Sequence, residues 1–353
     1  MTRDELIAWV QSGHEAVEVD ARGLDLAGAN LAGAIFRAVD FTGADLGGAD
    51  LRQSVFLDCR FDRSRWPETV TALASFSRCR FHRAALQRAQ LGRTNFAECH
   101  FSSCDFAAAD LALVTFARCV MDSVAFVQVR NDRTTFAECE LGALDFRNTV
   151  LDRTIFVKAD LRQARLAGAT LQNVVAMKAV LGGLSFAGMD LTLTQFIDAD
   201  VRECDFSGAT LRQCNFQGAQ GTGANFARAR AENAIFCNAG LTRADFRETR
   251  LAQAVFADAN LEQARFGGAD MRQCILHRAR CARADFRNAA LGEADLTHAD
   301  LTAADFSGAS MHRTRLHGVL DQDARFTDRS RALESDPELL EAERWKPVEV
   351  KIP

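Results

Sequence analysis

The sequence contains no tyrosine, although it contains 26 phenylalanines, and it has 38 arginines but only 4 lysines. A random globular core would mix the two aromatic rings, so the missing tyrosine indicates an unusual interior. No run approaches about 18 uncharged apolar residues, which excludes a transmembrane helix. The acidic start, Met1–Glu5, has no secretory h-region. We therefore expect a cytoplasmic protein, or one exported by a route that needs no signal peptide.

Phenylalanine recurs at multiples of five residues. All 26 have numbers that end in 1 or 6, and the 61 positions spaced by five from Leu26 to Phe326 hold 26 Phe, 23 Leu and 3 Met. A spacing of five matches neither the turn of an α-helix nor the alternation of a strand. The chain must therefore turn a corner in every repeat, and this internal repeat decides the fold.

A second position in each repeat sets the size of the coil. The residue two before each centre is nearly always small, so each pentapeptide places one large and one small side chain inside. Phenylalanine forms an unbroken series at a spacing of 20 from Phe36 to Phe156, and another from Phe186 to Phe326 on the opposite wall. Cysteine recurs at the small position with the same spacing, at Cys59, Cys79, Cys99, Cys119 and Cys139. Four pentapeptides therefore make one square turn.

The repeats resemble those of the pentapeptide-repeat family, whose unit reads Ala, then Asp or Asn, then Leu and two variable residues. Matching units begin at Ala29, Ala44, Ala49, Ala109, Ala159, Ala259, Ala294 and Ala299. The resemblance covers about residues 23–328. It implies an all-β solenoid, a right-handed quadrilateral β-helix of about 15 coils with 20 residues per coil and short helical caps at both ends.

Three segments follow from this pattern: an N-terminal helical cap over 1–22, the β-helix over 23–328, and a C-terminal helix and tail over 329–353. Thr2 and Glu5 make a capping box, which predicts a helix over 3–12. The segment Ser335–Glu338 repeats this signature with a proline at the helix start, which predicts a second helix from about 336 to 344.

Cysteine and histidine give no sign of catalysis, and a weak metal site at the histidines is the alternative to plain surface histidines. Nine of the 11 cysteines lie at the small inward position, and stacked neighbours would lie about 4.8 Å apart, longer than the Cβ separation of a disulfide. We expect free thiols that fill the core. His277, His298 and His317 fall near one another, but surface histidines explain them without a metal. Because the interior is too narrow for a substrate, we expect no enzyme, no catalytic residues, no metal and no cofactor.

The outward positions of one wall carry almost no charge. Along the wall centred on Phe36, Phe56 and so on to Leu316, 3 of the 30 residues that flank the centres are charged. Exposed apolar strips of this size mark interfaces, although β-branched residues also suit flat strands. We name this wall surface the uncharged stripe and predict that it binds a protein partner through Val55, Leu57, Thr115, Thr135, Ile155, Val157, Val175, Met177, Ile197, Ile235, Val255 and Ile275.

Arginine concentrates in residues 61–93, which carry seven Arg against two acidic residues. Four of these arginines occupy successive corners of one turn and are named the basic belt: Arg78, Arg83, Arg88 and Arg93. The belt suits an acidic partner, and a solvated belt without a partner is the alternative. We do not expect direct nucleic-acid binding, because the phenylalanines point inward and cannot stack on bases. The repeat breaks at Trp66–Thr71, where we expect an irregular corner or a small protrusion, and again at Asn131.

Together these features predict a non-catalytic protein-interaction scaffold or adaptor. The family resemblance implies possible links to bacterial secretion systems or effectors. It also implies an alternative, a DNA-mimicking protein that binds and protects a topoisomerase such as gyrase, which the net charge of only −5 and the basic belt disfavour. The partner is either an unidentified protein or a second copy of the chain, bound through the uncharged stripe or the C-terminal helix.

Overall fold

The chain folds into two compact units of square coils. The computed structural model describes residues 1–345. The first unit comprises Met1–Gly182 and Asp190–Asp200, and the second comprises Gly183–Met189 and the chain from Val201 onward. Within each unit, residues 20 apart lie beside one another in parallel, as the repeat predicts. The predicted fold class, a quadrilateral all-β solenoid with a short helix near each end, is confirmed. We name the four walls of the coils by their first centre residues: Leu26, Leu31, Phe36 and Phe41.

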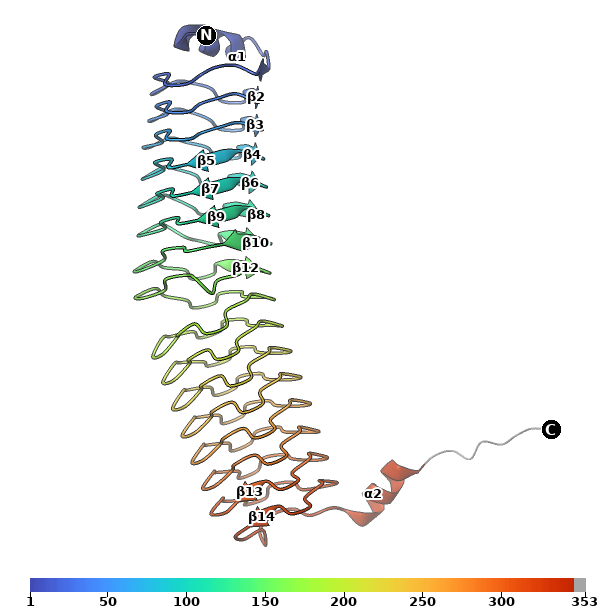
Figure 1. Cartoon of the computed structure of the whole chain (residues 1–353). Helices are drawn as coiled ribbons and strands as arrows, with labels where there is room; N and C mark the ends of the chain where they lie inside the picture. The colour runs from blue at the N-terminus through green and yellow to red at the C-terminus, as the bar shows by residue number, and fades with distance from the viewer. Residues whose placement is uncertain (346–353) are drawn as a thin grey trace, which may run out of the picture. The chain divides into compact units, whose positions relative to one another are not determined.

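Short parallel strands form two sheets in the first unit (Figure 1). Eight strands on the Phe36 wall stack in the order β1-β2-β3-β4-β6-β8-β10-β12, and four on the Phe41 wall stack in the order β11-β9-β7-β5. Their bounds are β1 Ala16–Val17, β2 Ile35–Arg37, β3 Val55–Leu57, β4 Ser75–Ser77, β5 Arg80–His82, β6 Asn95–Ala97, β7 His100–Ser102, β8 Thr115–Ala117, β9 Val120–Asp122, β10 Thr135–Ala137, β11 Glu140–Leu141 and β12 Ile155–Val157. In the second unit, β13 (Asp305–Phe306) pairs with β14 (Arg325–Phe326), and other coils meet through single bridges.

The corners explain the polar residue in each repeat. In nearly all repeats, the residue whose number ends in 3 or 8 adopts a left-handed backbone angle, as at Gln53 with φ of 61° and Asp58 with φ of 57°. Where Asp or Asn precedes a centre, its side chain can hold the following turn. For example, the Oδ1 atoms of Asp40, Asp110 and Asp300 accept from the N–H two residues later at 2.9, 3.0 and 3.0 Å. A short carboxylate or amide is the side chain that can close such a turn, which accounts for its place before the centre residue.

The interior is a closed stack of rings and small side chains. Phe116 is fully buried, and its ring stacks on those of Phe96 and Phe136 with centroids 5.1 Å away on each side. Small inward hydroxyls are satisfied by backbone, as where Thr134 donates to the Leu111 carbonyl at 2.7 Å. A tyrosine hydroxyl at a centre would project into packed rings, and burying it without a partner would cost free energy.

Both predicted helices are present. Helix α1 (Arg3–Gln11) begins with the expected capping box of Thr2 and Glu5 and buries Leu6 and Val10. Helix α2 (Pro337–Arg344) begins at Asp336, whose side chain accepts from the N–H groups of Glu338 and Leu339. Among the described residues, no helix is long and apolar enough to cross a membrane.

The irregular corner expected at Trp66–Thr71 is absent, and that prediction was wrong. Trp66 is buried, its N–H donates to the Ala85 carbonyl at 2.8 Å like other centres, and its indole N–H donates to Ser64 Oγ at 2.7 Å. Thr71 is also buried and shares a 2.6 Å hydrogen bond with Thr94. The coil tolerates these residues because each polar group finds a partner inside. At Asn131, the side-chain amide donates to Thr154 at 3.0 Å, but its carbonyl oxygen has no partner.

Candidate functional site

In the first unit, the uncharged stripe is the outer surface of the eight-stranded sheet. The middle strands bury their centre phenylalanine and turn two flanking side chains outward. Among the 18 flanking residues of this unit from Ile35 to Ile197, only Arg37 is charged, and Glu15 pairs with it at 2.9 Å. The predicted residues of this unit are all half-buried. Six lie on the sheet, namely Val55, Leu57, Thr115, Thr135, Ile155 and Val157, and three continue the same wall beyond β12, namely Val175, Met177 and Ile197.

The second unit carries the remaining predicted residues of the stripe on its own Phe36 wall. Ile235 bridges to Val255, and Val255 bridges to Ile275. The two isoleucines are 37% and 42% exposed, and Val255 is half-buried. This group is therefore an apolar row on the surface of the second unit, and the structure places every predicted stripe residue outside the core.

The Leu26 wall shows the opposite surface chemistry. Carboxylates there are held by an arginine two residues later, as in Asp145–Arg147 at 2.6 Å. Asp285 and Arg287 pair in the same way at 2.8 Å. Hydrogen bonds from these guanidinium groups hold the pKa of both carboxyls below the usual range. Exposed pairs of this kind contribute little stability, but they neutralise acidic groups that would otherwise project alone.

The basic belt occupies four corners of the first unit, and half of it is neutralised. All four arginines have left-handed φ angles between 52° and 65°. Arg78 contacts Asp58 at 2.7 Å, and Arg88 contacts Glu68 at 3.5 Å. Arg83 and Arg93 make no ion pair within residues 1–345. Within the described residues, the basic belt thus contains two arginines in ion pairs and two arginines without one.

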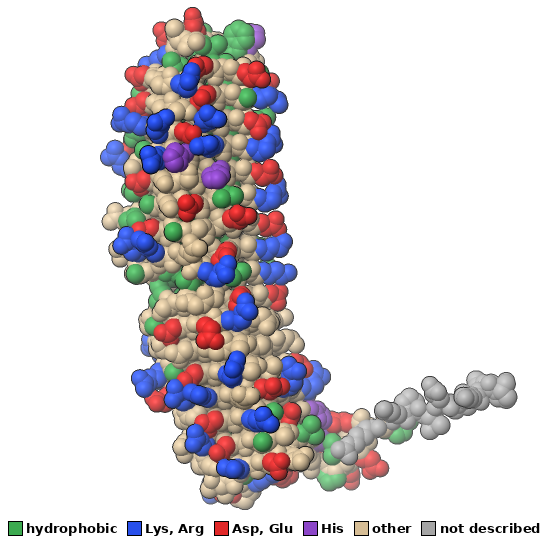
Figure 2. Space-filling model, viewed as in Figure 1, with side chains coloured by type: hydrophobic (Ala, Val, Ile, Leu, Met, Phe, Trp, Pro, Cys, Tyr) green, Lys and Arg blue, Asp and Glu red, His purple; other side chains and the backbone are tan. Residues whose placement is uncertain are grey.

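A ladder of alternating charges along one corner was missed at the sequence level. Each basic residue contacts the acidic residue one coil earlier, at 2.7 Å for Arg78 with Asp58, 2.8 Å for Arg118 with Glu98 and 2.6 Å for Lys158 with Glu138. Figure 2 shows acidic and basic side chains alternating along an edge of this unit. The signal was available, because opposite charges alternate at a spacing of 20 residues at this corner. The ladder borders the uncharged stripe and frames it with paired charges.

The cysteines are free thiols, as expected. Inward thiols donate to a carbonyl of the preceding coil, as Cys99 does to Phe76 at 3.4 Å. Burial raises the pKa of Cys104 and Cys274 to about 12. Cys237 is the least buried, and partial burial raises its pKa as well. Thiols with raised pKa values are poor nucleophiles, so Cys104 and Cys274 serve packing.

A group of titratable residues joins α2 to the second unit. The Nε2 atoms of His298 and His317 each lie 3.2 Å from the Glu343 carboxylate, and the three ligand atoms lie within 4.8 Å of one another. However, His317 Nδ1 accepts the N–H of Asp336 at 3.2 Å. In that tautomer the proton of neutral His317 is on Nε2, which donates to Glu343 and has no lone pair for a metal. The geometry is that of a hydrogen-bonded contact between α2 and the coils.

Solved structures that are similar to this chain have low sequence identity to it. A trypsin-treated form of QnrB1, a plasmid-mediated fluoroquinolone resistance protein, is 22% identical over 54% of this chain and 94% of that chain, with a TM-score of 0.37. HetL, a pentapeptide repeat protein involved in heterocyst differentiation regulation from the cyanobacterium Nostoc, is 20% identical over 77% of this chain and 97% of that chain, with a TM-score of 0.20. No curated protein matches the chain.

The repeats themselves match a known family along most of the chain. The sequence profile of the pentapeptide repeats matches eight times, at residues 17–53, 74–112, 134–173, 145–183, 178–208, 204–242, 239–278 and 279–318. These matches coincide with the square coils, the inward phenylalanines and the Asp-closed turns described above. The chain belongs to the pentapeptide-repeat family.

Proposed function

We propose that this protein is a non-catalytic interaction scaffold that binds a protein partner through the uncharged stripe of its first unit. The observation that carries the proposal is the contrast between walls. The outer surface of the eight-stranded sheet has a single charged flanking residue, Arg37, whereas the Leu26 wall carries Asp–Arg pairs such as Asp145–Arg147. A continuous uncharged surface on a chain that is otherwise rich in charge favours a protein interface.

The sheet also supports the proposal through its rigidity. Val55, Thr115, Thr135 and Ile155 each belong to a strand that is paired with strands of neighbouring coils, and the centre residues beneath them are stacked phenylalanines. Side chains held in this way lose little conformational freedom when a partner binds. A flat row of such residues suits a partner with a flat or extended apolar surface.

The second candidate, DNA mimicry toward a topoisomerase, has weaker support. A surface that imitates DNA needs rows of unpaired negative charge. Here the corner ladder and the Leu26 wall pair carboxylates with arginine or lysine, and the basic belt adds Arg83 and Arg93 without acidic partners. The net charge is −5. We therefore expect the purified protein to leave DNA supercoiling by gyrase unchanged at micromolar concentration, and clear inhibition or protection there would favour mimicry instead.

The test of the proposal is the substitution Ile155→Asp. Ile155 lies on β12 in the middle of the stripe and is half-buried, so a carboxylate there would be desolvated in any interface on this surface. We expect binding of a protein partner, whether a second copy or another protein, to weaken at least about tenfold. Sedimentation of the purified protein measures binding of a second copy. Capture from cell lysate, with identification by mass spectrometry, measures binding of another protein.

Val150→Asp is the matched control. Val150 belongs to the same coil but lies on the Leu31 wall, where it is 52% exposed. Thermal unfolding of both variants should resemble that of the unchanged protein. The proposal fails when neither variant changes any association, or when Val150→Asp weakens it as much as Ile155→Asp does.

A further inference from the structure

One wall of the first unit is open between two successive coils. On the Phe41 wall, each centre N–H normally donates to a carbonyl of the next coil, as Phe61 does to Arg80 at 2.8 Å and Leu161 does to Val180 at 2.9 Å. Within residues 1–345, Leu141 makes no such bond to Asp160, and the N–H of Asp160 does not reach the carbonyl of Cys139. The backbone ladder is therefore interrupted at β11, which is an edge of its four-stranded sheet.

Crowding inside the coil accounts for this opening. Leu144 fills an inward position that holds the smaller Val124 and Ala164 one coil before and one coil after, and it is completely buried. Its N–H turns back to the carbonyl of Gly142 at 2.8 Å. The corners at Ala143 and Gln163 lack the left-handed angle found at the neighbouring corners of the same wall. A larger side chain in a packed interior forces such backbone shifts.

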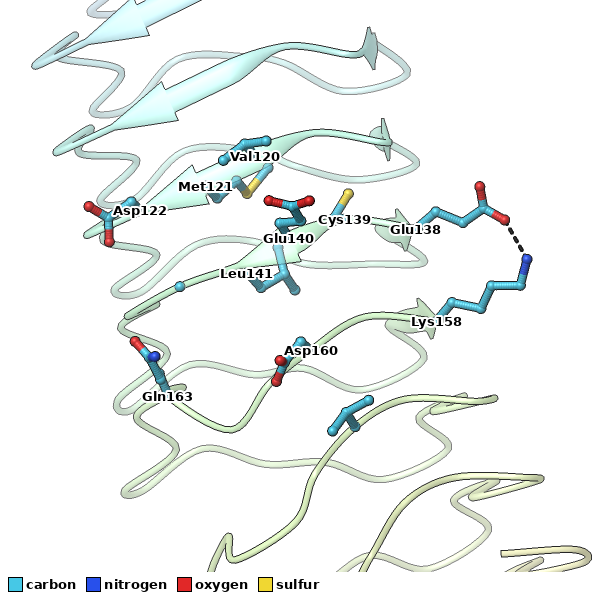
Figure 3. A pocket seen from close by; sticks show the side chains of 12 residues that line it. Val120, Met121, Asp122, Glu138, Cys139, Glu140, Leu141, Lys158, Asp160 and Gln163 are labelled. Atoms are coloured by element: carbon cyan, nitrogen blue, oxygen red, sulfur yellow. Dashed lines mark hydrogen bonds and ion pairs between the residues drawn. The ribbon is translucent and has the colours of Figure 1, made fainter.

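The opening forms a groove of about 740 Å³, which we name the acidic groove (Figure 3). It is lined by β9, β11 and the segment from Lys158 to Gln163. Four carboxylates line it against a single lysine: Asp122, Glu138, Glu140 and Asp160. Lys158 is paired with Glu138 at 2.6 Å, at the right of Figure 3, and Asp160 is paired with Arg162 at 2.5 Å, so two of the four carboxylates are neutralised. Glu140 has no ion pair anywhere in the described chain, so the groove keeps negative charge beside the open backbone.

We propose that the acidic groove binds an extended basic segment of a partner protein. An exposed strand edge pairs with an added strand, whose backbone would join the N–H of Leu141 and the N–H of Asp160. Lysine or arginine side chains of that segment would face Glu140 and Asp122. Charge complementarity favours a basic segment over an acidic one. The interrupted backbone hydrogen bonds favour an extended segment over a helix, because only an extended backbone can pair with them. The site lies on the Phe41 wall and meets the uncharged stripe only at the corner that holds Glu138 and Lys158.

A short labelled peptide of alternating lysine and valine with blocked ends tests the proposal by fluorescence anisotropy. We expect it to bind the full-length protein. An analogue with alternating glutamate and valine should not bind, and one with proline in place of valine should bind at least about tenfold more weakly, because proline has no backbone N–H. Equal binding of the lysine–valine and proline peptides would overturn the backbone pairing, and no binding of the lysine–valine peptide would overturn the site.

Protein variants locate the site. Glu140→Lys should weaken binding of the lysine–valine peptide at least about tenfold. Glu18→Lys makes the same charge change at an exposed corner of the first unit that is far from Glu140 in the sequence. This variant should leave binding unchanged. Ile155→Asp should also leave it unchanged, which separates this inference from the proposed function. Equal weakening by Glu140→Lys and Glu18→Lys would show general charge attraction and would overturn the proposal.

Discussion

The closed interior of the coils restricts which side chain each inward position of the repeat can hold. The centre residue of most repeats is sealed between the coils above and below and is apolar, with polar exceptions such as Thr71 where a partner lies within reach, whereas the small inward position accepts a hydroxyl or thiol because a carbonyl lies within reach. Phenylalanine meets the first requirement and tyrosine does not. The absence of tyrosine therefore follows from the packing of single side chains, and it leaves surface recognition to aliphatic and charged residues.

The substitution Phe116→Tyr tests this at the residue scale. The added hydroxyl would be buried without a partner between Phe96 and Phe136. We expect a loss of roughly 2–5 kcal/mol in the free energy of unfolding, from overpacking and from the unpaired polar group. Urea unfolding followed by circular dichroism measures it.

Phe326→Tyr is the control for that measurement. Phe326 is a centre residue of the last coil and is half-exposed, with the Arg329 guanidinium 4.7 Å from its ring centroid. A hydroxyl there reaches water, so the same chemical change should cost little. Equal losses for both substitutions would mean that the closed interior is not the reason for the missing tyrosine.

At the scale of elements, the five-residue spacing was sufficient to predict the coils and the walls, and the capping signals at Thr2–Glu5 and Ser335–Glu338 predicted both helices. The same pattern continues through Leu141 and Phe146 without a change, so it gives no sign of the open ladder between Leu141 and Asp160. That opening depends on how Leu144 fits between its neighbours, which is a property of packing and not of spacing. The wrong prediction at Trp66 has a similar cause, because Ser64 supplies the partner that the indole needs.

The contact of α2 with the coils likewise depends on residues that are far apart in the sequence. Glu343 lies 26 residues after His317 in the chain, and its carboxylate meets both His317 and His298 at 3.2 Å. The hydrogen bond from His317 lowers the pKa of the Glu343 carboxyl. The histidines were correctly placed near one another from the sequence, but nothing in the repeat indicated their partner on α2.

This contact predicts a pH dependence for α2. A folded-state pKa below the usual value means that the carboxylate stabilises docking at pH above about 4.5 and that this contribution is lost as the pH falls through the lowered value. We expect amide exchange in α2 to accelerate, beyond the intrinsic change, as the pH falls below about 4.5. Glu343→Gln should remove that acceleration, and the exposed Glu341→Gln should keep it. An unchanged pH profile in Glu343→Gln would contradict the contact.

At the scale of the whole molecule, each unit is a stack in which a coil contacts only its neighbours along the chain. Such repeats present long surfaces whose chemistry can differ from wall to wall while the interior stays the same. Here the Phe36 wall is uncharged, the Leu26 wall carries paired charges, and the Phe41 wall of the first unit holds the acidic groove. The central claim is that the Phe36 wall of the first unit is the surface that meets a protein partner.

Site-specific photo-crosslinking tests that claim most directly. A photoreactive residue in place of Thr135 sits on β10 in the uncharged stripe, and one in place of Val150 sits on the Leu31 wall nearby. Illumination in the producing cells should give a covalent adduct with a protein, either a second copy or another chain, from position 135 and not from position 150. An adduct from position 150 alone, or none from position 135, would contradict the account.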